Sequence, residues 1–258
     1  MTATSGYFVA GSSWLHRRNP LTKLLALGLI LLSAFLLPPV VLPVLAAVIV
    51  AAAWSAGLLR PMVRAMRIPA LLLLSIVVVN ALFFPGAKEA LVNVGPLSIT
   101  REGLTFGFTS AGRLLVAFLA SVVFLFTTLA DDMLEALIAR GASHRIAFVV
   151  LSAVQLVPRM RSRADAILAA QQARGLSLEG SFVRRIRALV PLIAPVLLGS
   201  LVDARERTFA LEARGFGARP GRTAYRIVAD PPIDRWLRIL IVVAAVAVVL
   251  AALGVIGR

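Results

Sequence analysis

Helix-length stretches of apolar residues alternate with short polar segments along the whole 258-residue chain. Runs such as Leu71 to Val79 and Ile239 to Leu253 are apolar on every side of a helix, so a helix built from either needs lipid or other apolar helices all around it. The pattern predicts five membrane spans, at Leu21 to Leu37, Val40 to Ala56, Ile68 to Phe84, Gly103 to Ala130 and Leu237 to Val255.

The composition supports a fold that lipid surrounds. Hydrophobic residues make up 60% of the chain and the mean hydropathy is +0.92, whereas ordinary soluble domains are about 45–50% apolar. One compact core cannot absorb that excess. We therefore expect an all-α, polytopic protein of the cell membrane with about five transmembrane helices.

The segments between the spans predict how the spans are joined. Pro38 and Pro39 separate the first two spans, so these two should form a tight helical hairpin. The stretch from Pro85 to Glu102 contains Gly86, Gly95 and Pro96 and has balanced charges, which is typical of a neutral loop and compatible with a short β-hairpin.

Charge decides the position of two further apolar segments, Ile146 to Pro158 and Ile186 to Val202. The chain has 27 basic residues, 25 of them arginine, against 12 acidic ones. If both segments crossed the membrane, the arginine-rich stretch between them would lie outside, against the positive-inside rule. We therefore expect a membrane part at 1–130, a cytoplasmic helical insert at 131–232 and a last span at 233–258. The N-terminus is then inside.

The insert contains a tripeptide repeat at two predicted helix ends, Ala173-Arg174-Gly175 and Ala213-Arg214-Gly215. Each helix should stop at its glycine, which adopts the left-handed C′ conformation without a Cβ clash. Two interpretations remain open on the residues alone. A cation at a helix C-terminus is an ordinary stop signal that the helix dipole favours, and an exposed arginine fork is also suited to binding another protein.

The residue pattern of the helix before the first repeat predicts that this helix packs against a partner. Its apolar stripe has a helical spacing, while the nearby charged residues, including Arg163, fall largely off it. The stripe consists of Leu156, Met160, Ala164, Ile167 and Gln171.

The order of short motifs along nearly the whole chain resembles the T component of energy-coupling factor (ECF) importers of vitamins and metals. The matching pieces are Asn19-Pro20-Leu21-Thr22-Lys23-Leu24, the stretch Gly95 to Leu104, Arg113, Thr127-Thr128, Val157-Pro158 and the two Ala-Arg-Gly helix ends. No single piece is specific, but their order is.

The resemblance implies a scaffold that couples two cytosolic ATP-binding-cassette ATPase subunits to a separate substrate-binding membrane subunit, the S component, for vitamin, cobalt or nickel uptake. In that family two Ala-Arg-Gly ends dock into grooves on the two ATPases. The resemblance therefore assigns docking to Ala173, Arg174, Gly175, Ala213, Arg214 and Gly215. A third copy, Ala139-Arg140-Gly141, lies where the family ends a different helix and is not included.

Several kinds of chemistry are not expected. The sequence has no cysteine and no Walker A motif, so thiol chemistry and phosphate cradling by this chain are excluded. His16 and His144 are far apart in sequence, and we expect neither a metal nor a cofactor. The basic stretches lack interleaved aromatic residues, which argues against nucleic acid as a partner.

Two rival functions remain. A permease that binds its own substrate would need polar groups within the spans, and Asn80 and Arg113 are nearly all there are; Arg113 fits a partner-binding or a bundle-holding role equally well. An intramembrane prenyltransferase would use Asp131 and Asp132 to hold magnesium. Those two residues also suit the N-terminus of the next helix, by capping it and by favouring its dipole.

Overall fold

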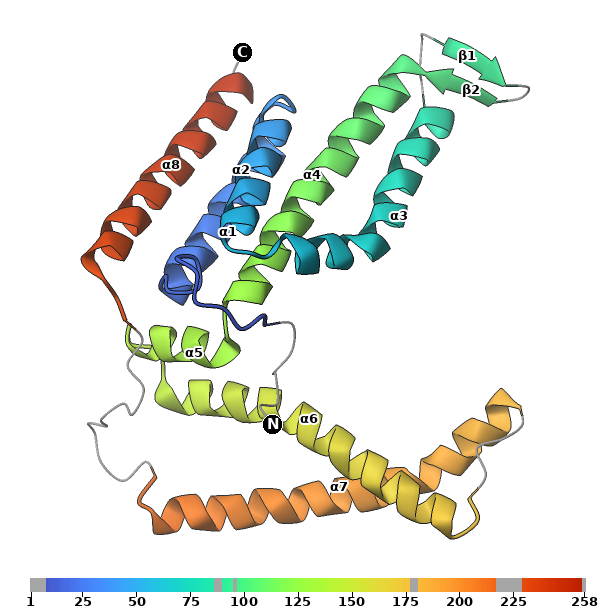
Figure 1. Ribbon diagram of the computed structural model, residues 1–258, viewed down its shortest axis with the longest axis vertical. Helices are drawn as coiled ribbons and strands as arrows, with labels where there is room; N and C mark the ends of the chain where they lie inside the picture. The colour runs from blue at the N-terminus through green and yellow to red at the C-terminus, as the bar shows by residue number, and fades with distance from the viewer. Residues whose placement is uncertain (1–7, 86–89, 95–96, 177–180, 217–228, 257–258) are drawn as a thin grey trace. The chain divides into compact units, whose positions relative to one another are not determined.

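The computed structural model describes residues 8–85, 90–94, 97–176, 181–216 and 229–256. Within these ranges the chain forms two compact units (Figure 1). The membrane unit comprises Met1–Arg140 and Val228–Arg258, and the two-helix unit comprises Gly141–Ile227. The elements of the membrane unit are α1 (Pro20–Leu36), α2 (Val41–Ser55), α3 (Leu59–Phe83), β1 (Ala90–Val94), β2 (Leu97–Thr100), α4 (Arg101–Thr127), α5 (Ala130–Ile138) and α8 (Pro232–Ile256). The two-helix unit contains α6 (His144–Ala173) and α7 (Phe182–Ala213).

Helix α4 is the centre of the membrane unit, because it packs against α1, α2 and α3, while α8 packs on α1. The core between these helices is apolar and contains many small side chains. Its buried members are Ala34, Leu42, Ile49, Ala53, Leu58, Met62, Val116, Leu119, Ala120, Val122 and Phe126. The expectation of an all-α membrane protein is confirmed.

Two glycines on α4 let it approach α3 closely. A Cβ added at Gly103 would collide with the backbone oxygen of Asn80, and one at Gly107 would lie 3.1 Å from the Cα of Val77. Spacing by four residues places both glycines on one face of the helix, the arrangement by which membrane helices without a hydrophobic driving force gain packing contacts. This close approach explains why α3 and α4 form the most extensive helix pair of the unit.

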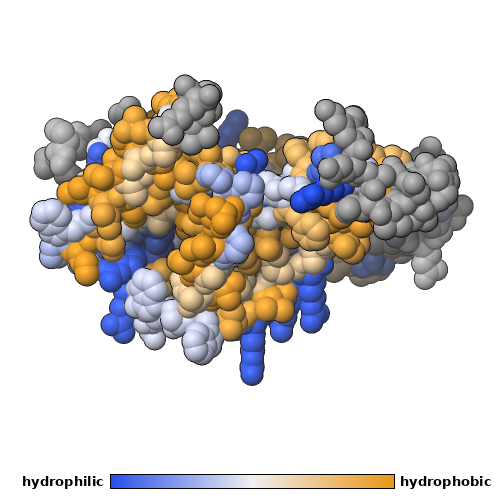
Figure 2. Space-filling view, turned by 90° about the horizontal axis from the view of Figure 1, so that it is seen from above, coloured by the Kyte–Doolittle hydropathy of each residue, from blue (hydrophilic) through white to orange (hydrophobic). Residues whose placement is uncertain are grey.

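The outer surface of the membrane unit is suited to lipid. Three helices, α3, α4 and α8, are long and apolar enough to cross a bilayer. Helices α1 and α2 are apolar but have 17 and 15 residues, about 25 Å and 22 Å of helix, which is less than the hydrocarbon core of roughly 30 Å. Leu71 of α3 is 73% exposed and Val243 of α8 is 60% exposed, so large apolar side chains lie on the outside of these two helices. Figure 2 shows how widely apolar residues cover the surface in that view.

The observed elements refine the predicted spans. Helix α3 begins at Leu59, nine residues before the predicted span, and contains Pro69, which cannot donate a backbone hydrogen bond; Figure 1 shows α3 as two segments that meet at an angle. Strands β1 and β2 pair antiparallel, with Val94 opposite Leu97. The short hairpin expected before α4 is therefore confirmed, as is the α1–α2 hairpin at the two prolines.

The two doubtful apolar segments lie in α6 and α7. Helix α7 continues through Pro191 and Pro195 as one helix of 32 residues. Among the described residues, neither α6 nor α7 has both the length and the apolar content that a membrane span requires. The cytoplasmic position of residues 131–232 remains a prediction.

Candidate functional site

The C-terminal end of α6 is a complete Schellman motif. The amide of Leu176 donates to the carbonyl of Gln171 (3.0 Å), and the amide of Gly175 donates to the carbonyl of Gln172 (3.0 Å). Gly175 has a φ of +93°. This conformation is energetically unfavourable for any L-residue that has a Cβ atom. The predicted stop at this glycine is confirmed, and Arg174 is the C-cap residue, exposed on the last turn.

The end of α7 repeats the same geometry. The amide of Phe216 donates to Leu211 and the amide of Gly215 to Glu212, each at 2.9 Å, and Gly215 has a φ of +72°. Arg214 is the exposed C-cap residue. The two helix ends therefore share both Schellman hydrogen bonds and the left-handed glycine, and the arginine side chain before each glycine is exposed.

The third Ala-Arg-Gly copy differs in its side chain. Gly141 also has a positive φ, of +93°, but a guanidinium nitrogen of Arg140 lies 3.7 Å from a carboxylate oxygen of Asp230. Within the described part of the chain, the guanidinium groups of Arg174 and Arg214 have no hydrogen-bond or ion-pair partner. A glycine with a positive φ is thus common to all three copies. Helix α5, however, already ends at Ile138 with Ala139 as its C-cap, and arginine side chains without a partner occur at the two ends in the two-helix unit.

An ion pair joins α6 to α7 within the two-helix unit. Arg163 holds Asp203 through both guanidinium nitrogens, at 2.8 Å and 3.1 Å, and a Cβ at Gly199 would lie 2.9 Å from the same guanidinium. The rings of Phe148 and Phe216 meet at 4.9 Å. Because the later residue of α6 pairs with the earlier residue of α7, the helices run antiparallel.

The two arginine ends are placed alike with respect to this ion pair. Arg174 follows Arg163 by 11 residues, and Arg214 follows Asp203 by 11 residues, which is about 16 Å of helix in each case. Since the helices are antiparallel, the two ends extend in opposite directions from the ion pair. Arg163 was expected to lie largely off the packing stripe of α6, but it is half-buried and forms this contact. The long arginine side chain reaches across from the edge of the stripe.

Three of the motifs behind the family resemblance lie at helix ends of the membrane unit. Asn19 caps α1 by accepting from the amide of Leu21 (3.0 Å), and Thr100 caps α4 by accepting from the amide of Gly103 (3.2 Å). The Lys23 ammonium donates to the carbonyl of Thr127 (2.7 Å), which brings the first motif to the end of α4. These motifs are therefore explained by the packing of the bundle.

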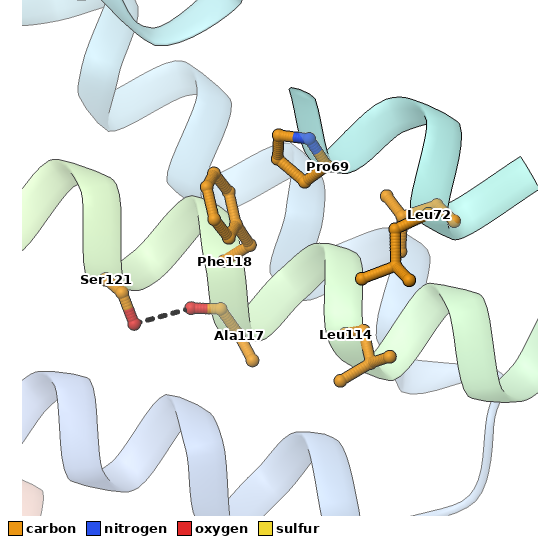
Figure 3. A pocket seen from close by; sticks show the side chains of 7 residues that line it. Pro69, Leu72, Leu114, Ala117, Phe118 and Ser121 are labelled. Atoms are coloured by element: carbon orange, nitrogen blue, oxygen red, sulfur yellow. Dashed lines mark hydrogen bonds between the residues drawn. The ribbon is translucent and has the colours of Figure 1, made fainter. Parts of the chain in front are cut away.

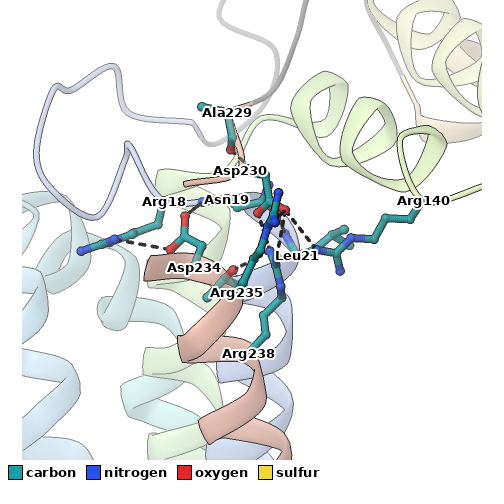
Figure 4. A network of polar contacts seen from close by, with 10 residues as sticks. Arg18, Asn19, Leu21, Arg140, Ala229, Asp230, Asp234, Arg235 and Arg238 are labelled. Carbon is teal, nitrogen blue, oxygen red and sulfur yellow. Dashed lines mark hydrogen bonds and ion pairs between the residues drawn. The ribbon is translucent and has the colours of Figure 1, made fainter. Parts of the chain in front are cut away.

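A buried polar network, which sequence reasoning missed, joins the N-terminal ends of α1 and α8 (Figure 4). Asp234 is fully buried and accepts from the amide of Asn19 (3.1 Å) and from Arg18 (3.5 Å). Arg238, 9% exposed, donates two hydrogen bonds to Asp230 at 2.8 Å and 2.9 Å. A charged pair spaced by four at the start of an otherwise apolar helix, Asp234 and Arg238, is the signal that would have indicated it.

Asp230 is held as a carboxylate by this network. The hydrogen bonds from Arg238 lower the pKa of the Asp230 carboxyl below its ordinary value, and the nearby charges of Arg140 and Arg235 act in the same direction, while partial burial opposes them. Asp230 therefore carries its negative charge at physiological pH, among the arginines that surround it.

The polar residues considered for substrate binding do not form a pocket. The amide of Asn80 donates to the carbonyl of Ile76 in its own helix (2.8 Å), and the Nε of Arg113 is buried with no hydrogen-bond partner among the described residues. A groove of about 250 Å³ between α3 and α4 is apolar apart from Ser121, whose hydroxyl bonds its own helix (Figure 3). Its lining comprises Pro69, Leu72, Leu73, Leu114, Ala117, Phe118 and Ser121.

The acidic residues considered for magnesium binding lie in different places and have other structural roles. Asp131 and Asp132 lie in the first turn of α5, where they favour the helix dipole. The N-cap residue is Leu129, without a side-chain cap hydrogen bond, so the prediction that the two aspartates cap the helix is wrong. A prenyltransferase needs a second acidic cluster, for which Asp203 would be a candidate, and Asp203 is bound by Arg163. Among the described residues, no three acidic, histidine or cysteine side chains gather as a metal site would require.

Comparison with known proteins identifies the class. The family model of CbiQ, described as cobalt transport protein, matches residues 11–225. The energy-coupling factor transporter transmembrane protein EcfT of Heliobacterium modesticaldum is 32% identical over 234 residues, covering 86% of this chain and 87% of that protein. The EcfT of Thermanaerovibrio acidaminovorans is 35% identical over 238 residues, covering 86% of each.

A third relative has a different architecture. An ABC transporter ATP-binding protein of Bifidobacterium longum is 32% identical over 251 residues, covering 93% of this chain but only 32% of that protein. The fold and these similarities define a polytopic membrane component of a transporter. The chain belongs to the CbiQ family of cobalt transport proteins and is the energy-coupling transmembrane component of an ECF-type ABC transporter.

Proposed function

We propose that Arg174 and Arg214 are the residues through which the chain docks to two cytosolic ATP-binding-cassette subunits. Each arginine inserts into one ATPase, with Ala173 and Gly175, or Ala213 and Gly215, allowing the helix end to approach closely. The observation that carries the proposal is the pair of Schellman ends with exposed arginines whose side chains have no partner in the described part of the chain. A guanidinium fork in this position is suited to bidentate, charge-assisted bonds with carboxylates or carbonyls.

The relative from Bifidobacterium longum supports ATPases as the partners. That protein is named as ATP-binding, and this chain corresponds to only 32% of its length. This chain has no Walker A motif, so it cannot itself supply the ATP binding for which that relative is named. Parts that are fused in one organism and separate in another are expected to work together.

The coupling function follows from how α6 and α7 are joined. When two ATPases close around ATP, they draw the two arginine ends together, and the antiparallel helices with their Arg163–Asp203 ion pair carry that displacement. The movement passes to a separate substrate-binding membrane subunit, which selects a vitamin or a transition-metal ion. The chain itself performs no covalent chemistry in this mechanism. The cytoplasmic insert of residues 131–232 would then be its coupling region, between the membrane part and the last span.

The test is the double replacement of Arg174 and Arg214 by alanine in the complex purified with its native ATPases. We expect loss of ATPase co-purification, and lysine at the same positions should restore it poorly because an ammonium cannot form the bidentate fork. Arg161→Ala with Arg205→Ala is the matched control, since both residues are exposed arginines on the same helices away from their ends. Intact co-purification and intact uptake in the Arg174/Arg214 variant would show that docking lies elsewhere.

A further inference from the structure

The arginine of the third Ala-Arg-Gly copy is engaged inside the membrane unit. Arg140 follows α5 and pairs with Asp230, their closest nitrogen and oxygen being 3.7 Å apart. Arg235 approaches the same carboxylate oxygen at 3.8 Å. Arg140 and Arg235 therefore lie at nearly the same distance from Asp230, but Arg140 follows α5 whereas Arg235 belongs to α8.

The partner of Arg140 is fixed to the transmembrane helices. Arg238 of α8 binds both carboxylate oxygens of Asp230 and also donates to the hydroxyl of Thr22 in α1 (3.3 Å). Next to Asp230, the carbonyl of Ala229 accepts from the side-chain amide of Asn19 (3.2 Å). Residues 229 and 230 are thus attached to the N-terminal ends of both α1 and α8, as Figure 4 shows.

The position of this ion pair along the chain gives it a special role. The two-helix unit begins after Arg140 and ends before Val228, so the chain connects the two units at two points only. Arg140 is the last residue before the first connection, and Asp230 is the third residue after the second. The Arg140–Asp230 pair therefore links the two connections where they join the membrane unit.

We propose that Arg140 and Asp230 form a clamp that holds these two connections together, and that this clamp lets displacement of the two-helix unit reach α1 and α8 instead of being lost in independent bending of the connections. Arg140 is a positioning residue in this role, and the proposal rests on the coupling function given above. The side chains of Arg140 and Asp230 are 42% and 33% exposed, and exposed ion pairs add little to stability. Loss of Arg140 is thus expected to leave the membrane unit folded.

The experiment measures how freely the two-helix unit moves relative to the membrane unit. The natural sequence has no cysteine, so Ser12→Cys and Ala204→Cys, both at exposed positions of different units, can carry spin labels in the complex purified with its ATPases. Arg140→Ala should broaden the measured distance distribution by about twofold, as expected when a tie between two bodies is released. Arg140→Lys should restore most of the narrow distribution.

Arg235→Ala is the matched control, because it removes the same charge at the same distance from Asp230 without touching a connection. The distance distribution of the Arg235→Ala variant should stay as narrow as that of the labelled chain that keeps both Arg140 and Arg235. Equal widths for Arg140→Ala and Arg235→Ala would overturn the clamp. ATPase co-purification should be unchanged in Arg140→Ala, whereas failure of the proposed docking would appear as unchanged co-purification in the Arg174/Arg214 variant, so the two failures are distinguishable.

Discussion

The membrane unit and the two-helix unit are both built from apolar helices, yet they bury their side chains very differently. In the membrane unit, Leu58 and Val116 are each only 1% exposed. In the two-helix unit, Ala147 is the one described apolar residue that is less than a tenth exposed. Val157 and Leu198 there are 69% and 63% exposed.

The difference shows that the same apolar composition serves two surroundings. Lipid solvates the outside of a bundle whose centre is already packed, so exposed apolar residues on α3 or α8 need no protein partner. Two helices with one shared seam cannot enclose their apolar residues, and large exposed apolar surfaces mark interaction sites. The two-helix unit is therefore expected to depend on its partners for stability, while the membrane unit is expected to fold without them.

The largest expected effect comes from breaking the close packing of the membrane unit. Gly103→Ala places a Cβ against the backbone of Asn80 and should destabilise the unit by about 3 kcal/mol, because backbone cannot move aside as a flexible side chain can. Thermal unfolding in detergent measures the loss. Gly28→Ala on α1, where a Cβ meets no atom within 4 Å, is the control and should be neutral or stabilising. Equal melting temperatures for both variants would refute close α3–α4 packing.

The helix ends of the two-helix unit should respond less strongly. Gly175→Ala and Gly215→Ala each force a Cβ into the left-handed region, at a cost of about 1–2 kcal/mol. Frayed ends would also move the adjacent arginines, so ATPase binding should weaken while the melting temperature of the membrane unit stays constant. A pull-down with the ATPases and a parallel melting curve separate the two effects. A loss of membrane-unit stability would contradict the independence of the units.

The ion pair between α6 and α7 should contribute less again. Arg163 and Asp203 are 35% and 58% exposed, and pairs of this kind are worth about 0.2–1 kcal/mol. A double-mutant cycle of Arg163→Ala and Asp203→Ala measures the coupling energy, with proteolysis of the two-helix unit as the readout. Additive single effects would mean that the pair does not hold the helices together.

The smallest expected effect is a pH dependence of the membrane unit. Because the pKa of Asp230 is lowered in the folded protein, its contribution is complete above the ordinary carboxyl pKa of about 4 and is lost as the pH falls through the lowered value. Melting temperatures measured from neutral to acidic pH should decline more steeply for the natural residue than for Asp230→Asn. If melting temperature declined equally with pH in both proteins, Asp230 would not contribute to the acid sensitivity.

Much of the architecture was predictable because it depends on local patterns. The spans, the hairpin before α4 and the glycine stops of α6 and α7 follow from apolar run length and from the conformational freedom of glycine. The N-terminal extension of α3 by nine residues was not predictable, since Arg60, Arg64 and Arg67 interrupt the apolar pattern. The other face of this helical segment packs on the core through Met62, which is buried, and Met66, which is partly buried. The role of the two arginine ends rests on the family resemblance and on their exposure.

The sequence by itself determined the helical membrane class, the glycine stops of α6 and α7 and the family, because these depend on residue type and short-range order. Only the tertiary structure decided which arginines are engaged. Arg140 is separated from Asp230 by 90 positions and Arg163 from Asp203 by 40, and no local pattern specifies a charge pair over such distances. Three identical tripeptides thus acquire different surroundings from the packing of helices far apart in the chain.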